Sequence, residues 1–313
     1  MSYSLDGEKS GQDGDTCATF LSQVTKSSLS GMLQFTDKTH FMNVIICLED
    51  QVESYNAAFE AAHPHTTDEQ IEAIIDSLGW NEDQPLIDFE NSLGFSSLRA
   101  SVESQIDTWL NGSSSGDIAT SPDNIPVLDE ETRSLLTPDC KVKIDSTIVD
   151  FCASYDNSFS DDGSRSTVCG YNTNTADELP YASNNKKIHV YLSMVNAGVL
   201  LNPLNFRNSA IVGKVVSYKK SGSKWKRYRT ALNINISGTV WRVAACSGST
   251  DTFNKYKPDS ASTLRRRKLR KIRLYTGISY PPHLVICSED NEVSALGSAG
   301  ETMSDFLKVF IKF

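Results

Sequence analysis

Apolar residues recur every three or four positions between residues 37 and 111, the spacing that lines one face of a helix. The first stripe starts at Phe41 and ends at Phe59. Two later stripes predict short helices over about residues 85–94 and 97–111, each followed by a glycine. A further helix is predicted between the first stripe and the two later ones. Together these helices form a predicted small bundle.

That further helix has the clearest boundary signals. Thr67 is an N-cap residue, and Gln70 stands at the position that completes a capping box. Ile71 and Leu78 lie at the two ends of its apolar stripe, and Gly79 is typical of a helix C-terminus. The sequence therefore predicts a helix that begins after Thr67 and ends before Gly79.

From residue 186 onward, apolar and polar residues alternate with a period of two, which predicts strands. The predicted strands cover residues 187–192, 211–218, 225–229, 232–236, 240–245, 272–275, 283–287 and 306–313, with a turn at Ser237-Gly238. Short strands at such intervals are typical of sandwiches and barrels. We predict an α+β protein: a small acidic helical bundle followed by a basic, mostly antiparallel β-sandwich or open barrel.

Composition divides the 313 residues further, into about two domains with connecting segments. The polar N-terminus predicts a flexible arm, and a Ser/Gly/Pro-rich stretch predicts a linker. A strand is predicted over residues 142–151, before a second polar stretch. The predicted divisions are a flexible arm (1–30), a helical domain (31–112), a linker (113–126), a mixed, loop-rich segment (127–185) and a β domain (186–313).

Charge is distributed very unevenly along the chain. Residues 1–150 carry 7 Lys and Arg against 27 Asp and Glu, a net charge of −20. Residues 151–313 carry 23 against 12, a net charge of +11, and the whole chain is −9. Such asymmetry indicates an interaction surface, although two solvated domains of different composition would also produce it.

The positive charges gather in two clusters. The first contains aromatic residues among its lysines, and the second has seven cations in the ten residues 264–273. We predict an electrostatic interface formed by Lys219, Lys220, Lys224, Lys226, Arg227, Arg229, Arg265, Arg266, Arg267, Lys268, Arg270 and Lys271. Cations interleaved with aromatic rings also suit phosphates and stacked bases, so nucleic acid is an alternative partner.

Signals of catalysis or metal binding are weak. The sequence contains neither HExxH nor GxxxxGK[ST], and it has no CxxC pair. His63 and His65 stand near two carboxylates, but a polar turn between helices explains them equally well. We therefore expect no enzyme activity, no cofactor and no metal.

Seven cysteines with wide, irregular gaps do not form a disulfide framework. Cys47 and Cys287 stand in apolar runs, which predicts buried thiols. Cys152 and Cys169 flank one polar stretch, and whether they form a disulfide is left open. The cysteines therefore do not decide the redox compartment.

These observations predict a structural or interaction protein that docks acidic surfaces, either copies of itself or another protein. In this account the basic clusters face carboxylates of the helical domain, such as Glu49, Asp50, Glu53, Glu72 and Asp76. A nucleic-acid-binding β domain is the first alternative. A surface ligand or glycan binder is the second, and it would use Trp225, Trp241 and Tyr275.

Three stretches resemble uncharacterised proteins common in Bacteroidota. They are PLIDFE with GFSSLR (residues 85–99), SPDNIPVLDEETRSLLTPDCKVKI (residues 121–144) and YKKSGSKWKRYR (residues 218–229). The resemblance implies a helical N-terminal region and a β-rich C-terminal region, with no known activity. It also implies an extracellular, cell-surface or particle-associated protein, whereas residues 1–15 have no apolar core typical of a signal peptide.

Overall fold

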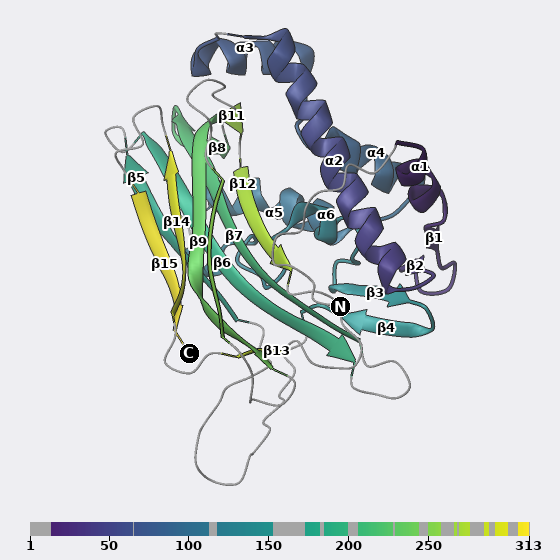
Figure 1. Ribbon diagram of the computed structural model, residues 1–313. Coiled ribbons are helices and arrows are strands. Elements are labelled where there is room, and N and C mark those ends of the chain that lie inside the picture. The colour runs from purple at the N-terminus through teal and green to yellow at the C-terminus, as the bar shows by residue number, and fades with distance from the viewer. Residues whose placement is uncertain are drawn as a thin grey trace. The chain divides into compact units, whose positions relative to one another are not determined.

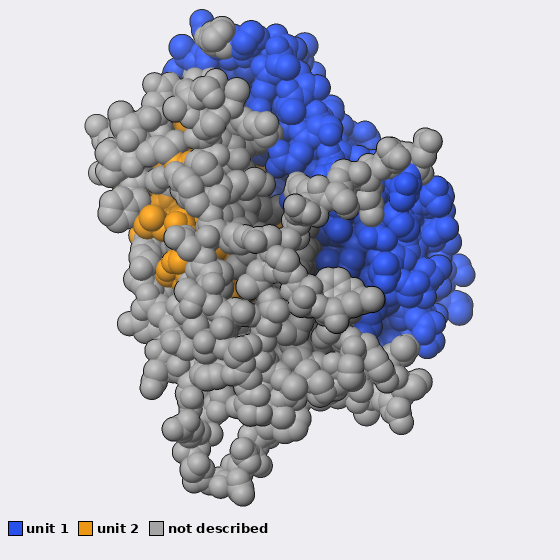
Figure 2. All heavy atoms as spheres, in the orientation of Figure 1, with its two compact units in different colours: residues 1–103, 130–150 blue, residues 104–129, 151–313 orange. Residues whose placement is uncertain are grey.

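A computed structural model describes residues 14–64, 66–112, 118–152, 173–181, 185–199, 206–227, 229–243, 250–257, 266–267, 269–275, 285–287, 292–299 and 306–312. The chain forms two compact units, coloured separately in Figure 2. Unit 1 comprises residues 1–103 and 130–150, and unit 2 comprises residues 104–129 and 151–313. These divisions differ from the predicted ones, because the chain leaves the helical unit at residue 104 and returns to it at residue 130.

Unit 1 contains the predicted helices (Figure 1). They are α2 (Lys38–Ala62), α3 (Asp68–Leu78), α4 (Gln84–Ser92) and α5 (Leu98–Asn111), with short helix α6 (Glu130–Arg133) added. α5 runs from unit 1 into unit 2. The capping box of Thr67 and Gln70 is present, and Gly79 ends α3 in the left-handed conformation. No helix within the described ranges is long and apolar enough to cross a membrane.

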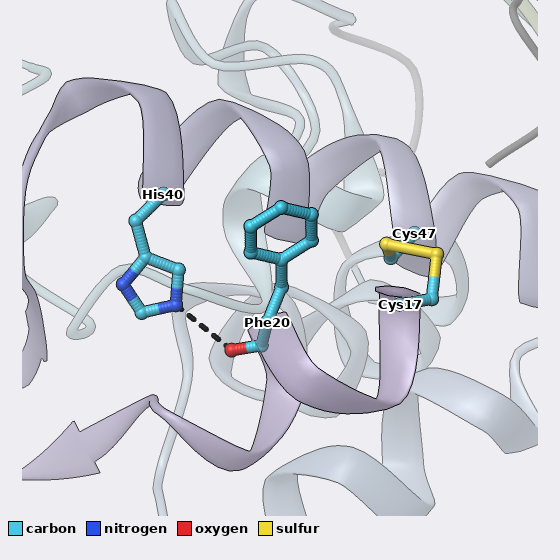
Figure 3. The surroundings of a disulfide bond; sticks show 4 residues. All are labelled: Cys17, Phe20, His40 and Cys47. Carbon is cyan, nitrogen blue, oxygen red and sulfur yellow. Dashed lines mark hydrogen bonds between the residues drawn. A yellow bond between two sulfur atoms is a disulfide. The ribbon is translucent and has the colours of Figure 1, made fainter. Parts of the chain in front are cut away.

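The predicted flexible arm contains a helix, α1 (Gly14–Ser22), which a disulfide joins to α2. Cys17 and Cys47 form this bond, and Cys47 is fully buried (Figure 3). Nearby, His40 Nε2 lies 2.8 Å from the carbonyl oxygen of Phe20 at the end of α1. The prediction of a buried Cys47 thiol is therefore wrong: the residue is buried, but oxidised. Spacing could not reveal this pair, because its members lie on different helices.

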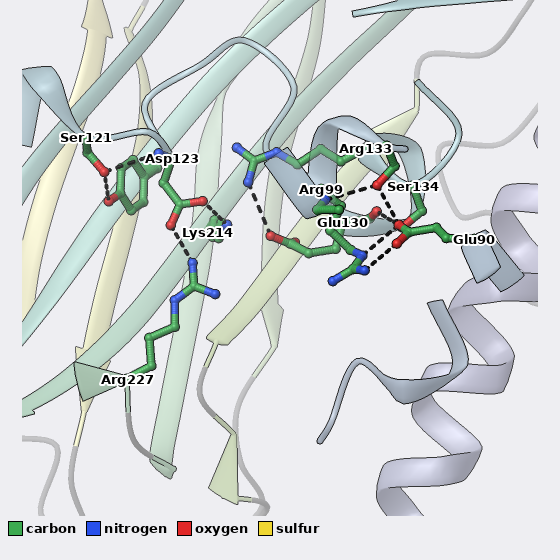
Figure 4. Close-up of polar contacts among 12 residues, drawn as sticks. Glu90, Arg99, Ser121, Asp123, Glu130, Arg133, Ser134, Lys214 and Arg227 are labelled. Carbon is green, nitrogen blue, oxygen red and sulfur yellow. Dashed lines mark hydrogen bonds and ion pairs between the residues drawn. The ribbon is translucent and has the colours of Figure 1, made fainter. Parts of the chain in front are cut away.

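A four-stranded sheet completes unit 1, in the order β1 (Thr25–Lys26), β2 (Leu33–Phe35), β3 (Lys141–Ile144), β4 (Thr147–Asp150). The strand predicted over residues 142–151 is a hairpin instead, turned at Asp145, which has a positive φ of 55°. Between α4 and α5, Arg99 and Glu90 form a buried ion pair (Figure 4). Ser97 donates a hydrogen bond to the same carboxylate.

Unit 2 is built on two antiparallel sheets (Figure 1). The first has the order β12 (Leu269–Tyr275), β7 (Phe206–Ser221), β6 (Lys186–Val199), β5 (Thr173–Tyr181), and β8 (Lys224–Arg227) also pairs with β7. The second has the order β10 (Thr250–Lys257), β9 (Thr230–Val243), β14 (Glu292–Ala299), β15 (Phe306–Lys312). β11 (Arg266–Arg267) and β13 (Val285–Cys287) also pair with β9. Together the units confirm the predicted α+β class.

The two sheets of unit 2 pack face to face, with β6 and β7 against β14 and β15. Ile188, Val190 and Val215 are buried in this layer. Gly297 of β14 lies so close to β6 that an added Cβ would stand 2.5 Å from a methyl group of Val190. A glycine is therefore needed for the sheets to approach here.

Four strands of unit 2 differ from the predictions. β9 is continuous through Ser237-Gly238, where a turn is predicted, because Gly238 pairs with residues of both β10 and β14. β5 lies inside the stretch predicted to be loop-rich, and β10 and β14 are strands that the periodicity does not indicate. Such strands depend on neighbours distant in sequence, which local patterns do not contain.

Candidate electrostatic interface

Strand register places three lysines directly opposite one another at one end of the first sheet of unit 2. Lys186 of β6 pairs with Lys219 of β7, which pairs with Lys226 of β8. Directly paired residues share one face of a sheet, at about 5 Å between Cβ atoms. Lys224, two residues before Lys226, lies on the same face. We call Lys186, Lys219, Lys224 and Lys226 the lysine ladder; Lys224 is exposed and the other three are partly exposed.

Strands β7 and β8 form a hairpin. Its face opposite to the lysine ladder holds an aromatic ring between two cations. The ammonium of Lys187 lies 4.7 Å from the ring centroid of Trp225, and that of Lys220 lies 5.9 Å from it. Lys187 is itself buried and paired with Glu178 at 2.7 Å. Trp225 is thus held by an anchored cation, in a cation–π contact.

The edge of β8 is fastened by a side chain from α5. The Oδ1 atom of Asn111 accepts a hydrogen bond from the backbone N–H of Trp225 at 2.8 Å. Its Nδ2 atom donates one to the carbonyl oxygen of the same residue at 3.2 Å. The amide therefore pairs with the strand edge as another strand would.

Behind the hairpin, a buried carboxylate pairs with two cations of the sheet (Figure 4). Asp123 accepts hydrogen bonds from Lys214 and Arg227, both at 2.8 Å, and both Asp123 and Lys214 are completely buried. Arg227 is 10% exposed, so its guanidinium contributes to the interior. The shared carboxylate offsets part of the desolvation cost of both cations.

Asp123 belongs to the stretch predicted to be a linker. Its described residues, 118–126, instead lie on the first sheet of unit 2: Ser121 is buried 3.1 Å from the hydroxyl of Tyr191, and Ser193 donates a hydrogen bond to the carbonyl of Pro126. The stretch is Ser/Pro-rich because it follows an irregular path across a sheet.

On the face of the first sheet that carries Lys214, a hydrogen-bonded row is formed by Glu178, His189 and Tyr191. His189 Nε2 lies 2.8 Å from Glu178 Oε2, and its Nδ1 lies 3.1 Å from the hydroxyl of Tyr191. Burial lowers the pKa of His189, although its hydrogen bond with Glu178 opposes this. Burial alone would raise the pKa of Glu178, but hydrogen bonds from His189 and Lys187 outweigh it and lower that pKa to about 2.

The predicted basic residues therefore separate into several groups. Lys219, Lys224 and Lys226 meet on the ladder, Lys220 lies on the other face, and the structure adds Lys186, which only the register reveals. Arg227 and Arg229 do not form an exposed interface: Arg227 pairs with Asp123, and Arg229 is 1% exposed. Charge patterns alone cannot distinguish these arginines from surface cations.

The second predicted cluster lies partly within the described strands. Arg266 and Arg267 belong to β11, and Arg270 and Lys271 belong to β12. Arg265 and Lys268 are outside the described residues. Since β12 and β8 pair with the same edge of β7, the topology places part of this cluster along the strand that carries the ladder.

The weaker candidates do not form sites among the described residues. No group of three or more metal-ligating side chains occurs within them. His63 Nδ1 lies 2.9 Å from the carbonyl oxygen of Phe59, and His65 is outside the described part. Cys140 and Cys152 are disulfide-bonded, whereas Cys169 falls outside the described residues, as do the aromatic side chains of Trp241 and Tyr275.

No family model matches the sequence. No curated protein matches it either. Among solved structures, the chain is similar to a DUF4848 family protein from Bacteroides thetaiotaomicron, with 10% identity and a TM-score of 0.24. The match covers 93% of this chain and 100% of that one.

Proposed function

We propose that this chain is a non-catalytic binding protein whose unit 2 docks acidic protein surfaces through the lysine ladder. The observation that carries the proposal is the direct pairing of Lys186, Lys219 and Lys226 across three strands. Cations gathered on one face of a sheet give that face a positive potential. Carboxylates on a partner surface are attracted to such a potential, which favours docking at the ladder.

The ladder is also held in place before any partner arrives. Asn111 fastens the edge of β8, Lys187 holds Trp225, and Asp123 holds Arg227. A surface already ordered loses less conformational entropy on binding. These contacts therefore favour a recognition role for the hairpin.

The internal row of Glu178, His189 and Tyr191 supports a non-catalytic assignment. Its groups resemble a proton relay in composition, but His189 and Tyr191 have no exposed surface. A general base must lie within hydrogen-bond reach of its substrate. In this fold the row joins strands β5 and β6 instead.

The disulfide between Cys17 and Cys47 supports an oxidising compartment for this protein. Stable disulfides are rare in reducing cytosol and common in exported proteins. We propose that the chain works outside the cytoplasm, where acidic surfaces of other exported proteins are its partners.

Trp225 favours a second candidate function, single-stranded nucleic-acid binding. An aromatic ring among cations can stack on a base, which contributes about 1–3 kcal/mol per base. Trp225 is partly exposed, and its ring already lies against Lys187. The two candidates differ in what they require: nucleic acid needs the ring, whereas an acidic protein needs the ladder.

Fluorescence anisotropy with labelled poly-L-glutamate and labelled oligothymidylate tests the proposal. Wild type should bind poly-L-glutamate, and Lys224→Glu/Lys226→Glu should weaken this at least about tenfold. The control Lys143→Glu, on β3 of unit 1, should have little effect. Binding of oligothymidylate alone, lost in Trp225→Ala, would replace the proposal by the nucleic-acid function. Binding of neither probe would overturn both.

A further inference from the structure

Helix α3 presents an apolar stripe that unit 1 covers only in part. Ile71 is buried, Ile74 and Ile75 are partly exposed, and Leu78 is 63% exposed. Large aliphatic side chains this accessible are informative when they stand in a row on one helix face. Those of α3 recur at positions three and four apart, so they form one stripe.

This stripe belongs to a well-formed helix. The capping box at Thr67 closes the N-terminus, and Gly79 closes the C-terminus. Immediately after it, Trp80 stacks on Phe59 of α2, with ring centroids 4.0 Å apart. The helix is therefore anchored at its end while Leu78 remains accessible.

A row of carboxylates follows the stripe. Glu72 and Asp76 are four residues apart, so they lie on the same side of α3, about 6 Å apart along its axis. Helix α3 also contains Asp68 and Glu69 and has no lysine or arginine. Its accessible face thus combines aliphatic side chains with acidic ones.

The lysine ladder has the complementary chemistry and spacing. Neighbouring strands lie about 4.8 Å apart, and residues two apart along a strand lie about 6.7 Å apart, so its ammonium groups are spaced much like Glu72 and Asp76. Each lysine also has a four-carbon stem that covers apolar side chains while its charge stays in water. The apolar stems of the lysines can pack against Leu78 and Ile75, and their ammonium groups can pair with the carboxylates of the helix.

We infer that the occupant of the ladder is helix α3 of a second copy of this chain. The inference rests on the proposed function and names its partner. Leu78 and Lys224 are both exposed on the single chain, so both surfaces are accessible to another copy. Because the two surfaces differ, two copies can exchange both contacts in a closed dimer, or make one contact and leave one of each surface for a further copy.

Sedimentation velocity on the full chain tests this at increasing protein concentration. Wild type should form dimers and longer species at low salt and dissociate as salt rises. Glu72→Lys/Asp76→Lys and Lys224→Glu/Lys226→Glu should each weaken association at least about tenfold. Leu78→Ser should weaken it without changing charge, and the control Asp107→Lys, an exposed position of α5, should not.

Mixing the two double variants is the decisive step. Each retains one intact surface, the ladder in the first variant and helix α3 in the second, so the ladder of one can bind α3 of the other. A mixture should therefore form complexes that neither variant forms alone. Wild-type monomers at all concentrations would overturn the inference. If such monomers still bind poly-L-glutamate through the ladder, the proposed function stands and only its partner is wrong.

Discussion

Asp123 and Lys214 are 91 residues apart in sequence and form an ion pair at 2.8 Å, with neither side chain exposed to solvent. Arg227 completes the group from β8. The carboxylate of Asp123, which comes from an irregular segment, thus joins strand β7, through Lys214, to strand β8, through Arg227. The relationship explains how a strand as short as β8 is held in place.

Asp123→Asn should destabilise unit 2 by about 3–5 kcal/mol, because it leaves two cations buried beside a neutral amide. Lys214→Met in the same chain should restore part of that loss, since it removes one of the uncompensated charges. Urea unfolding monitored by tryptophan fluorescence measures both. Equal stability of Asp123→Asn and wild type would show that the pair does not hold the sheet.

Asp83 should make unit 1 less stable as pH rises. Burial, together with the nearby carboxylates of Glu82, Glu103 and Glu130, raises its pKa from 3.8 to about 7, although Arg99 opposes them. The folded state therefore holds this proton more tightly than the unfolded state. The resulting stabilisation is complete below about pH 4 and is lost as pH rises through 7.

Asp83→Asn should remove this dependence and should be more stable than wild type at pH 8, by about 2 kcal/mol. Thermal unfolding of both proteins between pH 4 and pH 8 measures the difference. Parallel stability curves for the two proteins would contradict the assignment.

Reduction should destabilise unit 1. The Cys17–Cys47 bond closes a loop with a sequence separation of 30, for which chain entropy predicts about 3–4 kcal/mol. Cys17→Ser/Cys47→Ser should therefore lower the melting temperature. At least four of the seven cysteines are disulfide-bonded, counting those in the described residues, so thiol titration of the denatured, unreduced chain should find at most three. Seven thiols would contradict the structure.

Gly297→Ala should destabilise unit 2 by about 1–3 kcal/mol, because its methyl group would overlap a methyl of Val190. Val190→Ala should cost stability alone, but less in the presence of Gly297→Ala. A double-mutant cycle measured by urea unfolding gives the coupling energy. Strict additivity of the two changes would show that these sheets do not meet at this point.

The helices of unit 1 were predictable from the sequence because their signals are local. Thr67, Gln70 and Gly79 lie within or beside the helix whose ends they determine. The strands of unit 2 were predictable in part, but not β5, which lies in a polar stretch and is fixed by its pairing with β6. Alternation indicates that a strand exists and says nothing about its neighbour.

Of the candidate interface, only its lysine-rich composition was predictable from the sequence. The sequence indicates a lysine-rich hairpin, but Lys186 joins it through the register of β6, 33 positions before Lys219. Likewise, Arg227 stands between surface cations in sequence and turns inward because Asp123 lies opposite it. Buried partners of this kind are distant in sequence, so charge counting cannot identify them.

Lys186 provides the most direct test of the account, because only the three-strand register places it on the interface. Lys186→Gln and Lys226→Gln should weaken poly-L-glutamate binding by similar factors, about three- to fivefold each at low salt, and Lys143→Gln should not change it. Equal affinities for all three variants and wild type, measured by anisotropy at low salt, would contradict the lysine ladder as a docking surface.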